Sequence, residues 1–143
     1  MNITEIRVKL VRGGSDKLRG FASMTLDDSL VIRDLKIIEG KSGLFVAMPS
    51  RKLHDRCPQC RGKNPLRARF CNDCGKRLST DRGELDGRGR IRLYADIAHP
   101  IHQEGRDHVQ AMVVDGYHRE LLASKRVGYV PQSFEDLDYH LLE

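Results

Sequence analysis

The chain has 143 residues, enough for one small domain and an added module, and its net charge is +5, from 25 Lys or Arg and 20 Asp or Glu. No apolar run approaches the length of about 18 residues that a membrane span needs. The N-terminal sequence MNITEIRVKL also lacks the features of a secretion signal. We therefore expect a cytoplasmic protein with no membrane partner.

The first fifty residues have the pattern of β-structure. Apolar and polar side chains alternate, and Val and Ile are frequent. The predicted strands are 3–11, 18–26, 29–40 and 44–48. Short turns separate them, including a loop at 12–17 and a tight turn at Asp27 and Asp28. Strands joined by such short loops favour an antiparallel meander.

Residues 51–92 differ in composition from the rest of the chain. They contain thirteen Lys or Arg against five Asp or Glu, whereas the other residues contain twelve against fifteen. Such a local positive charge favours an anionic partner for this segment. The alternative is a solvated basic insert without such a partner. Within the segment, residues 83–92 are predicted to be a flexible or hairpin-like connector.

A helix is predicted after residues 93–100, because the apolar residues that follow recur at i, i+3 and i+4. They are Val109, Met112, Val113, Tyr117 and Leu121. Gly116 weakens this prediction, since glycine costs about 1 kcal/mol relative to alanine in a helix. The fold class is then α+β: a four-stranded antiparallel β-meander packed with a C-terminal helix. Its apolar edge strand at 44–48 would be exposed, so we expect a homodimer that covers it.

All four cysteines lie close together, as Cys57-x2-Cys60-x10-Cys71-x2-Cys74. Two CxxC pairs at this spacing can supply four thiolates to one tetrahedral zinc ion. The string CPQCRGKNPLRARFCNDCGKRL also resembles small zinc ribbons. Secreted disulfide scaffolds spread their cysteines along the chain instead. We therefore predict one structural Zn²⁺ per chain.

Three other uses of the cysteines compete with this prediction. Rubredoxin-type iron has the same ligands, but its usual surroundings are aromatic and acidic, whereas these are basic. A redox dithiol needs only one CxxC pair and a thioredoxin-like βαβ context, which this sequence lacks. A catalytic zinc ion needs an open coordination position, and four thiolates close the shell.

Basic residues surround the predicted ribbon and continue into the strand before it. We predict that they contact nucleic-acid phosphates. They are Arg51, Lys52, Arg56, Arg61, Lys63, Arg67, Arg69, Lys76 and Arg77. Phe70 is expected to pack against Leu66 or Leu78 rather than to stack on a base.

The remaining candidate residues give no catalytic site. His99 and His102 flank Pro100 before the helix. They either form part of a second metal site or have a purely structural role. No Ser/His/Asp set, glycine-rich phosphate loop or carboxylate pair has the spacing and context of an active site. We therefore predict neither catalysis nor a small-molecule substrate.

Two blocks of the sequence resemble the SpoVG family of bacterial septation regulators. They are ASMTLDDSLVIRDLKIIEGKSGLFVAMPSRK at 22–52 and ADIAHPI at 95–101. The resemblance covers about residues 1–52 and 93–122, and the cysteines lie between the two blocks, where the family has a short polar loop. It implies a small dimeric α+β protein that binds DNA and RNA and acts as a regulator without catalysis.

These observations predict three parts. They are a SpoVG-like core at 1–52 and 93–128, a zinc-ribbon insertion and connector at 53–92, and an acidic tail at 129–143. The expected function is regulation through DNA or RNA in the bacterial cytoplasm, including at the nucleoid, with the basic ribbon contributing to phosphate binding. The alternative is a dimeric platform that uses the ribbon to dock a protein partner.

Overall fold

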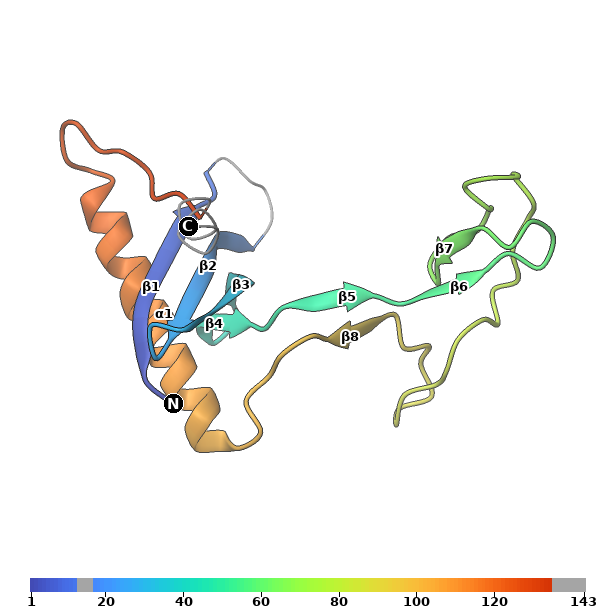
Figure 1. Cartoon of the computed structure of the whole chain (residues 1–143), viewed down its shortest axis with the longest axis horizontal. Coiled ribbons are helices and arrows are strands. Elements are labelled where there is room, and N and C mark those ends of the chain that lie inside the picture. Colours follow the sequence, from blue (N-terminus) through green and yellow to red (C-terminus); the bar gives the residue numbers. More distant parts are fainter. Residues whose placement is uncertain (13–16, 135–143) are drawn as a thin grey trace. The chain divides into compact units, whose positions relative to one another are not determined.

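The computed structural model describes residues 1–12 and 17–134. It divides the chain into two compact units: Met1–Pro49 with Ala98–Glu143, and Ser50–Ile97. Figure 1 labels their elements. These are β1 (Ile3–Leu10), β2 (Leu18–Leu26), β3 (Leu30–Gly40), β4 (Gly43–Ala47), β5 (Ser50–Lys52), β6 (His54–Arg56), β7 (Lys63–Pro65), β8 (Tyr94–Asp96) and α1 (Gln103–Ala123). Most of the predicted loop at 12–17 lies outside the described residues.

The first four strands form one antiparallel sheet in the order β1-β2-β3-β4, which confirms the predicted meander. The turn between β2 and β3 is the tight one expected at Asp27 and Asp28, whose φ angles are 49° and 52°. The N–H of Ser29 donates to the carbonyl oxygen of Leu26 at 2.9 Å. Positive φ at both central residues gives a two-residue turn whose twist matches that of the flanking strands.

A β-bulge in β3 brings both Ile32 and Leu35 toward the core. Ile32 is paired with Met24 and Leu35 with Ala22, so two residues of β3 lie opposite one residue of β2. Asp34 lies in this bulge and has a φ of 62°. In a regular strand, side chains three positions apart point to opposite faces. The extra residue therefore lets β3 contribute both apolar side chains to the same face.

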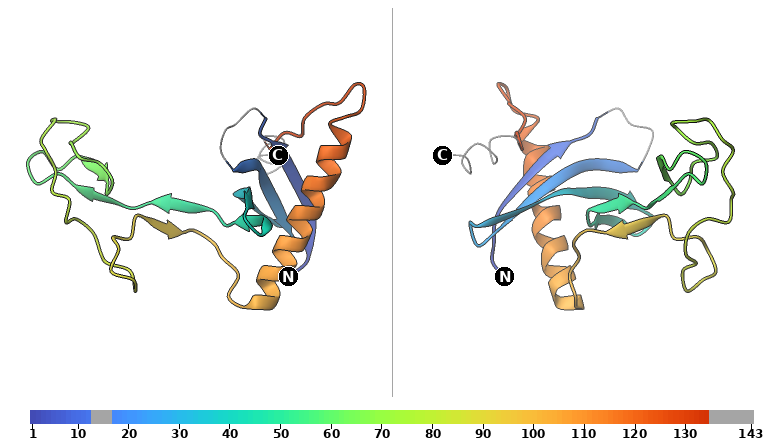
Figure 2. Two further views of the ribbon diagram at one scale, coloured as in Figure 1. Left: turned by 180° about the vertical axis from the view of Figure 1, so that it is seen from behind. Right: turned by 45° about the vertical axis from the view of Figure 1, so that its right-hand side comes forward.

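Helix α1 packs against the sheet, as the further views in Figure 2 show. Val109, Val113 and Tyr117 are buried, which confirms the centre of the predicted apolar stripe. They pack against Val8, Ala22, Met24, Leu35, Ile37 and Val46 of the sheet. Nδ1 of His102 accepts a hydrogen bond from the N–H of Gly105 at 2.9 Å, so this histidine caps the helix N-terminus. Among the described residues, no helix has the length and apolar character of a membrane span.

The chain that follows α1 contacts the same unit. The hydroxyl of Tyr129 donates a hydrogen bond to the buried carboxylate of Glu120, and this bond raises the pKa of Tyr129. Oε1 of Gln132 accepts a hydrogen bond from the N–H of Val8 in β1 at 2.8 Å. The predicted acidic tail thus begins with residues that contact the core, and its remainder, 135–143, lies outside the described residues.

Gly116 lets α1 approach β1 closely. A Cβ atom at this position would lie 2.7 Å from Cγ2 of Ile6 and 3.6 Å from Cγ2 of Val8. The first distance is far shorter than a van der Waals contact, so a larger residue would push the helix and the strand apart. The tighter packing that this close approach allows offsets the poor helix propensity of glycine.

We expect Gly116→Ala to lower the free energy of unfolding by about 1–3 kcal/mol, because the added methyl group overpacks the contact with Ile6. In an Ile6→Ala background, the same substitution should be neutral or stabilising, since alanine has the higher helix propensity and the clashing Cγ2 is gone. Chemical denaturation followed by far-UV circular dichroism measures both effects. An equal loss of stability in the two backgrounds would contradict the close-contact explanation.

Candidate metal centre and its basic surroundings

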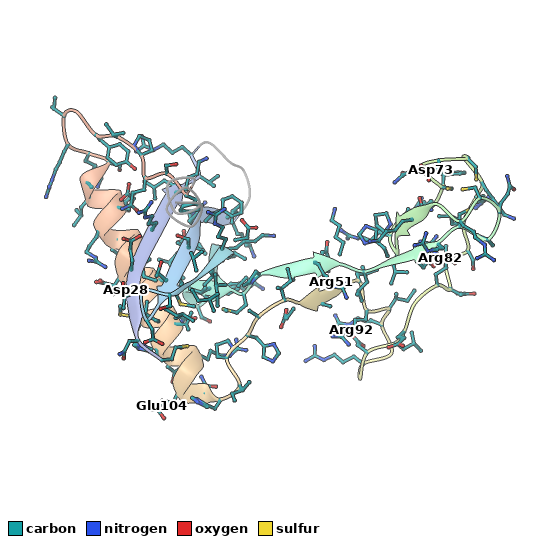
Figure 3. All side chains as sticks on the ribbon, in the orientation of Figure 1. Asp28, Arg51, Asp73, Arg82, Arg92 and Glu104 are labelled. Atoms are coloured by element: carbon teal, nitrogen blue, oxygen red, sulfur yellow. The ribbon has the colours of Figure 1, made fainter. Side chains whose placement is uncertain are left out.

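The Ser50–Ile97 unit is built from very short strand pairs. β5 pairs with β8, and β6 pairs with β7, both antiparallel and over three residues. Figure 3 shows the side chains of this unit, with Arg51 on β5 and Arg82 beside β6. Its cluster of buried apolar residues consists of Cys57, Cys71 and Leu78, with a partly buried alanine against them. Apolar burial is therefore concentrated at the cysteines.

The sulfur atoms of Cys57, Cys60, Cys71 and Cys74 all lie within 4.8 Å of one another. Sγ of Cys57 lies 3.7 Å from that of Cys74, and Sγ of Cys60 lies 3.5 Å from that of Cys71. A tetrahedral ion with metal–sulfur bonds of about 2.3 Å requires sulfur–sulfur separations of about 3.8 Å. The arrangement fits one four-coordinate ion, so these cysteines could hold a metal.

The two CxxC pairs adopt the same backbone turn. The N–H of Cys57 donates to the carbonyl of Gly62 at 2.8 Å, and the N–H of Arg61 donates to the carbonyl of Cys57 at 2.9 Å. The turn that begins at Cys71 repeats both bonds, at 2.8 and 3.0 Å. The fifth residue of each turn has a positive φ, 63° at Arg61 and 77° at Gly75. Glycine adopts this conformation freely, whereas arginine adopts it at some cost.

Backbone N–H groups in both turns point at the sulfurs. The bonds are Gln59 to Cys57 Sγ at 3.4 Å, Gly62 to Cys60 Sγ at 3.3 Å and Asp73 to Cys71 Sγ at 3.4 Å. Such donors favour the thiolate, which is the form that binds metals. The N–H of Cys74, together with the side-chain amide of Asn64, lowers the pKa of Cys71 to about 6. The N–H of Cys60 lowers the pKa of Cys57.

The pKa of Cys60 is instead raised, to about 12. The N–H of Gly62 lowers it, but the sulfurs of Cys71, Cys74 and Cys57, together with burial, raise it by more. Four thiolates this close together repel one another. A divalent cation between them would remove that repulsion, so the charge of the donor set also fits a metal ion.

Asn64 is a buried polar residue that links the two turns, and sequence reasoning did not identify it. Its side chain is fully buried, and its Nδ2 donates to Cys71 Sγ at 3.4 Å and to the carbonyl of Gly62 at 3.1 Å. Its Oδ1 accepts a hydrogen bond from the N–H of Asn72 at 2.8 Å. Groups that hydrogen-bond a metal ligand in this way orient it and tune its charge. From the sequence alone, an asparagine between two CxxC pairs that contacts a cysteine cannot be distinguished from one that is exposed to solvent.

Arg82 is a second residue that the sequence did not single out. Its Nε lies 2.9 Å from Oδ2 of Asp55, and its guanidinium donates to the carbonyls of Ala68 at 3.1 Å and Pro65 at 2.8 Å. These bonds tie the chain that leaves the ribbon back to it. Because its side chain is only 10% exposed, Arg82 has a structural role rather than a place on the positive surface.

The connector at 83–92 forms a hairpin, one of the two predicted alternatives. Leu85 is paired with Ile91, and the N–H of Asp86 donates to the carbonyl of Arg90 at 2.7 Å. Oδ1 of Asp86 accepts hydrogen bonds from backbone N–H groups inside the turn at 2.8 and 3.0 Å. This carboxylate therefore closes the loop.

All nine basic residues predicted to contact phosphates are exposed. Arg56 Nη1 donates to the carbonyl of Arg61 at 3.2 Å, and Arg67 Nη1 lies 3.5 Å from the hydroxyl of Tyr94. Within the described residues, the other side chains have neither a hydrogen bond nor an ion pair. They are Arg51, Lys52, Arg61, Lys63, Arg69, Lys76 and Arg77. The unit thus presents a surface of cations without partners in the described residues.

Phe70 is not in the ribbon interior, where the sequence had predicted it to pack. Its side chain is 58% exposed and does not belong to the cluster around Leu78. It is paired with Arg77. The residue that follows each member of this pair, Cys71 after Phe70 and Leu78 after Arg77, is buried. Because side chains alternate between faces along a strand, burial of Cys71 and Leu78 turns Phe70 and Arg77 outward. The prediction of a packed Phe70 was therefore wrong.

Comparison with known proteins identifies the family. A family model described as SpoVG matches residues 1–119. The chain is 37% identical over 120 residues to "Putative septation protein SpoVG" of Lachnospira eligens, which covers 83% of this chain and 93% of the relative. Proteins of the same name are 32% identical over 138 residues in Finegoldia magna (96% and 94% covered) and 35% identical over 121 residues in Bdellovibrio bacteriovorus (85% and 77% covered). The chain belongs to the SpoVG family.

Proposed function

We propose that this SpoVG-family chain is a nucleic-acid-binding regulatory protein whose Ser50–Ile97 unit contacts phosphates. One observation carries the proposal: seven exposed cations of this unit have no side-chain partner within the described residues. The unit holds thirteen Lys or Arg against six Asp or Glu. The relatives are named as putative septation proteins, so septation is the process in which we place this regulation.

The lack of partners matters because a paired cation must give up its carboxylate before it can bind a phosphate. A free cation loses only its hydration and its counterions, and release of the counterions condensed on nucleic acid drives binding. Contacts of this kind position a protein on the backbone without reading sequence. Such contacts fit DNA and RNA equally. Binding of an acidic protein is the competing explanation for the exposed cations.

We also propose that Cys57, Cys60, Cys71 and Cys74 hold one structural Zn²⁺ per chain. The support is the sulfur spacing, the N–H groups that point at the sulfurs and a four-thiolate shell with no position left for a reacting group. A bound ion supplies folding free energy to a unit with a small core. It also fixes cations directly, because Arg61 and Lys76 belong to the two metal-binding turns.

The third part of the proposal is a homodimer that covers β4. Within the described part of the chain, β4 pairs on one side only, with β3. The other edge strand, β1, already donates a hydrogen bond to Gln132. Phe45 on β4 is 42% exposed. An edge strand with an exposed aromatic residue is readily covered by a second copy.

Elemental analysis of protein purified under reducing conditions should give one Zn²⁺ per chain. Asn64→Ala should weaken Zn²⁺ binding by about 10- to 100-fold, as expected for loss of a group that hydrogen-bonds a ligand. Competition with a chelator measures this affinity. Asn72→Ala is the matched control, because only its backbone N–H contacts Asn64. Iron or no metal in the wild type would refute the zinc proposal, and equal affinities of the two variants would refute the role of Asn64.

Replacement of Arg67, Arg69, Lys76 and Arg77 by alanine should flatten the salt dependence of nucleic-acid binding. On duplex DNA, the slope should fall by up to about 0.9 log unit of affinity per log unit of salt for each phosphate that the variant no longer binds. Fluorescence anisotropy at several salt concentrations, with DNA and with RNA, measures the slopes. A chelator should also weaken binding to the wild type, because the charges remain while their fixed positions disappear.

The matched control places the same charge change in the other unit, on exposed lysines. It replaces Lys9, Lys36, Lys41 and Lys125 by alanine. This control should keep the wild-type slope. If the variant in the basic unit also keeps that slope, the unit is not the phosphate-binding surface, and docking of an acidic protein becomes the better explanation.

Light scattering at micromolar concentration should report twice the 16.3 kDa mass of the chain. Phe45→Lys should shift the protein toward the monomer, because it places a charge on the covered edge. Leu30→Lys, at a residue that is 59% exposed beside a turn, is the control and should remain dimeric. A monomeric wild type would exclude the dimer, and an unchanged mass for Phe45→Lys would exclude β4 as its interface.

A further inference from the structure

We infer that Phe70 and Arg77 form a stacking site for an unpaired base, so that the ligand of the basic unit is single-stranded nucleic acid. The inference rests on the proposed phosphate binding and specifies its ligand. It starts from the one aromatic side chain between the two CxxC pairs, whose ring is 58% exposed instead of packed.

The backbone places the two side chains next to each other. Phe70 and Arg77 lie directly opposite in an antiparallel bridge. The flanking bonds run from Cys71 N–H to the carbonyl of Lys76 and from Leu78 N–H to the carbonyl of Arg69, both at 2.8 Å. The pair itself is therefore a non-hydrogen-bonded one, in which the Cα atoms are about 4.5 Å apart and side chains come closest.

The metal-binding turn holds this pair in place. Phe70 directly precedes Cys71, and Arg77 follows Lys76, whose carbonyl closes the second turn at 2.8 Å. Burial of Cys71 and Leu78 on the inner face fixes the outward direction of both side chains. The ring thus cannot turn into the ribbon interior without breaking the bridge.

The surroundings of Phe70 favour a base over an apolar protein surface. Its cross-strand neighbour Arg77 is an exposed cation on the same face, and Arg69 and Lys76, which are adjacent to the pair in the chain, are also exposed. An apolar docking patch needs contiguous apolar surface, whereas the residue directly opposite this ring is a cation. An exposed aromatic ring beside a cation suits single strands, because a base stacks on the ring while phosphates meet the positive charges of the unit.

A duplex would use this site poorly. Its base faces are already stacked on one another, so the ring could reach one only after a base pair opens. In a single strand the base faces are free, and every base offers one, so the site should be tolerant of sequence. The guanidinium of Arg77 can add a cation–π contact to the same base.

The test compares a thymidine oligomer with an oligomer of equal length that has the same sugar–phosphate chain and no bases. Wild type should bind the thymidine oligomer about five- to tenfold more tightly, at the low end of what base stacking contributes. Phe70→Ala and Phe70→Leu should bind the two oligomers equally, because leucine keeps the apolar bulk but has no aromatic face. Phe70→Tyr should restore the preference.

Leu85→Ala is the matched control, since this side chain is 67% exposed in the same unit; it should keep the wild-type preference. The zinc content of each variant shows whether the ribbon is still formed. If wild type binds both oligomers equally and with steep salt dependence, the stacking site is refuted while phosphate binding stands. If wild type binds neither oligomer nor a duplex, the proposed function itself fails.

Discussion

The Ser50–Ile97 unit depends on the placement of four sulfur atoms. Its buried apolar cluster is formed by Cys57, Cys71 and Leu78, two of which are themselves members of the sulfur group. Ordering a backbone costs about 1–2 kcal/mol per residue, and burial on this small scale cannot offset that cost. The repeated turns, the bonds of Asn64 and the outward pair of Phe70 and Arg77 all follow from how the chain surrounds the sulfurs.

The other unit solves the same problem by ordinary packing, and local details of its backbone make that packing possible. The bulge at Asp34 lets both Ile32 and Leu35 face the helix. The missing side chain at Gly116 lets the helix come close to Ile6. Both positions break a rule of regular secondary structure. At both positions the gain is in packing between the helix and the sheet, which are distant in sequence.

This contrast explains what the sequence could predict. The four strands of the sheet, the helix and the cysteine group were accessible, because alternation and CxxC spacing are local signals. The outward direction of Phe70 was not, because it depends on which residues of its hairpin are buried. The role of Asn64 depends on a strand register that pairs Asp55 with Asn64, which composition does not specify. These features required knowledge of which segments lie side by side.

Arg61 connects the cluster of four cysteines to the charged surface. It occupies in the first turn the position that Gly75 occupies in the second, with nearly the same hydrogen bonds and a φ of 63° against 77°. A non-glycine residue in this region carries a conformational cost of roughly 1 kcal/mol, and such costs are commonly found at functional positions. A glycine would remove the strain but also one of the unpartnered cations beside the sulfurs. The turn therefore places a charge where backbone geometry alone favours none.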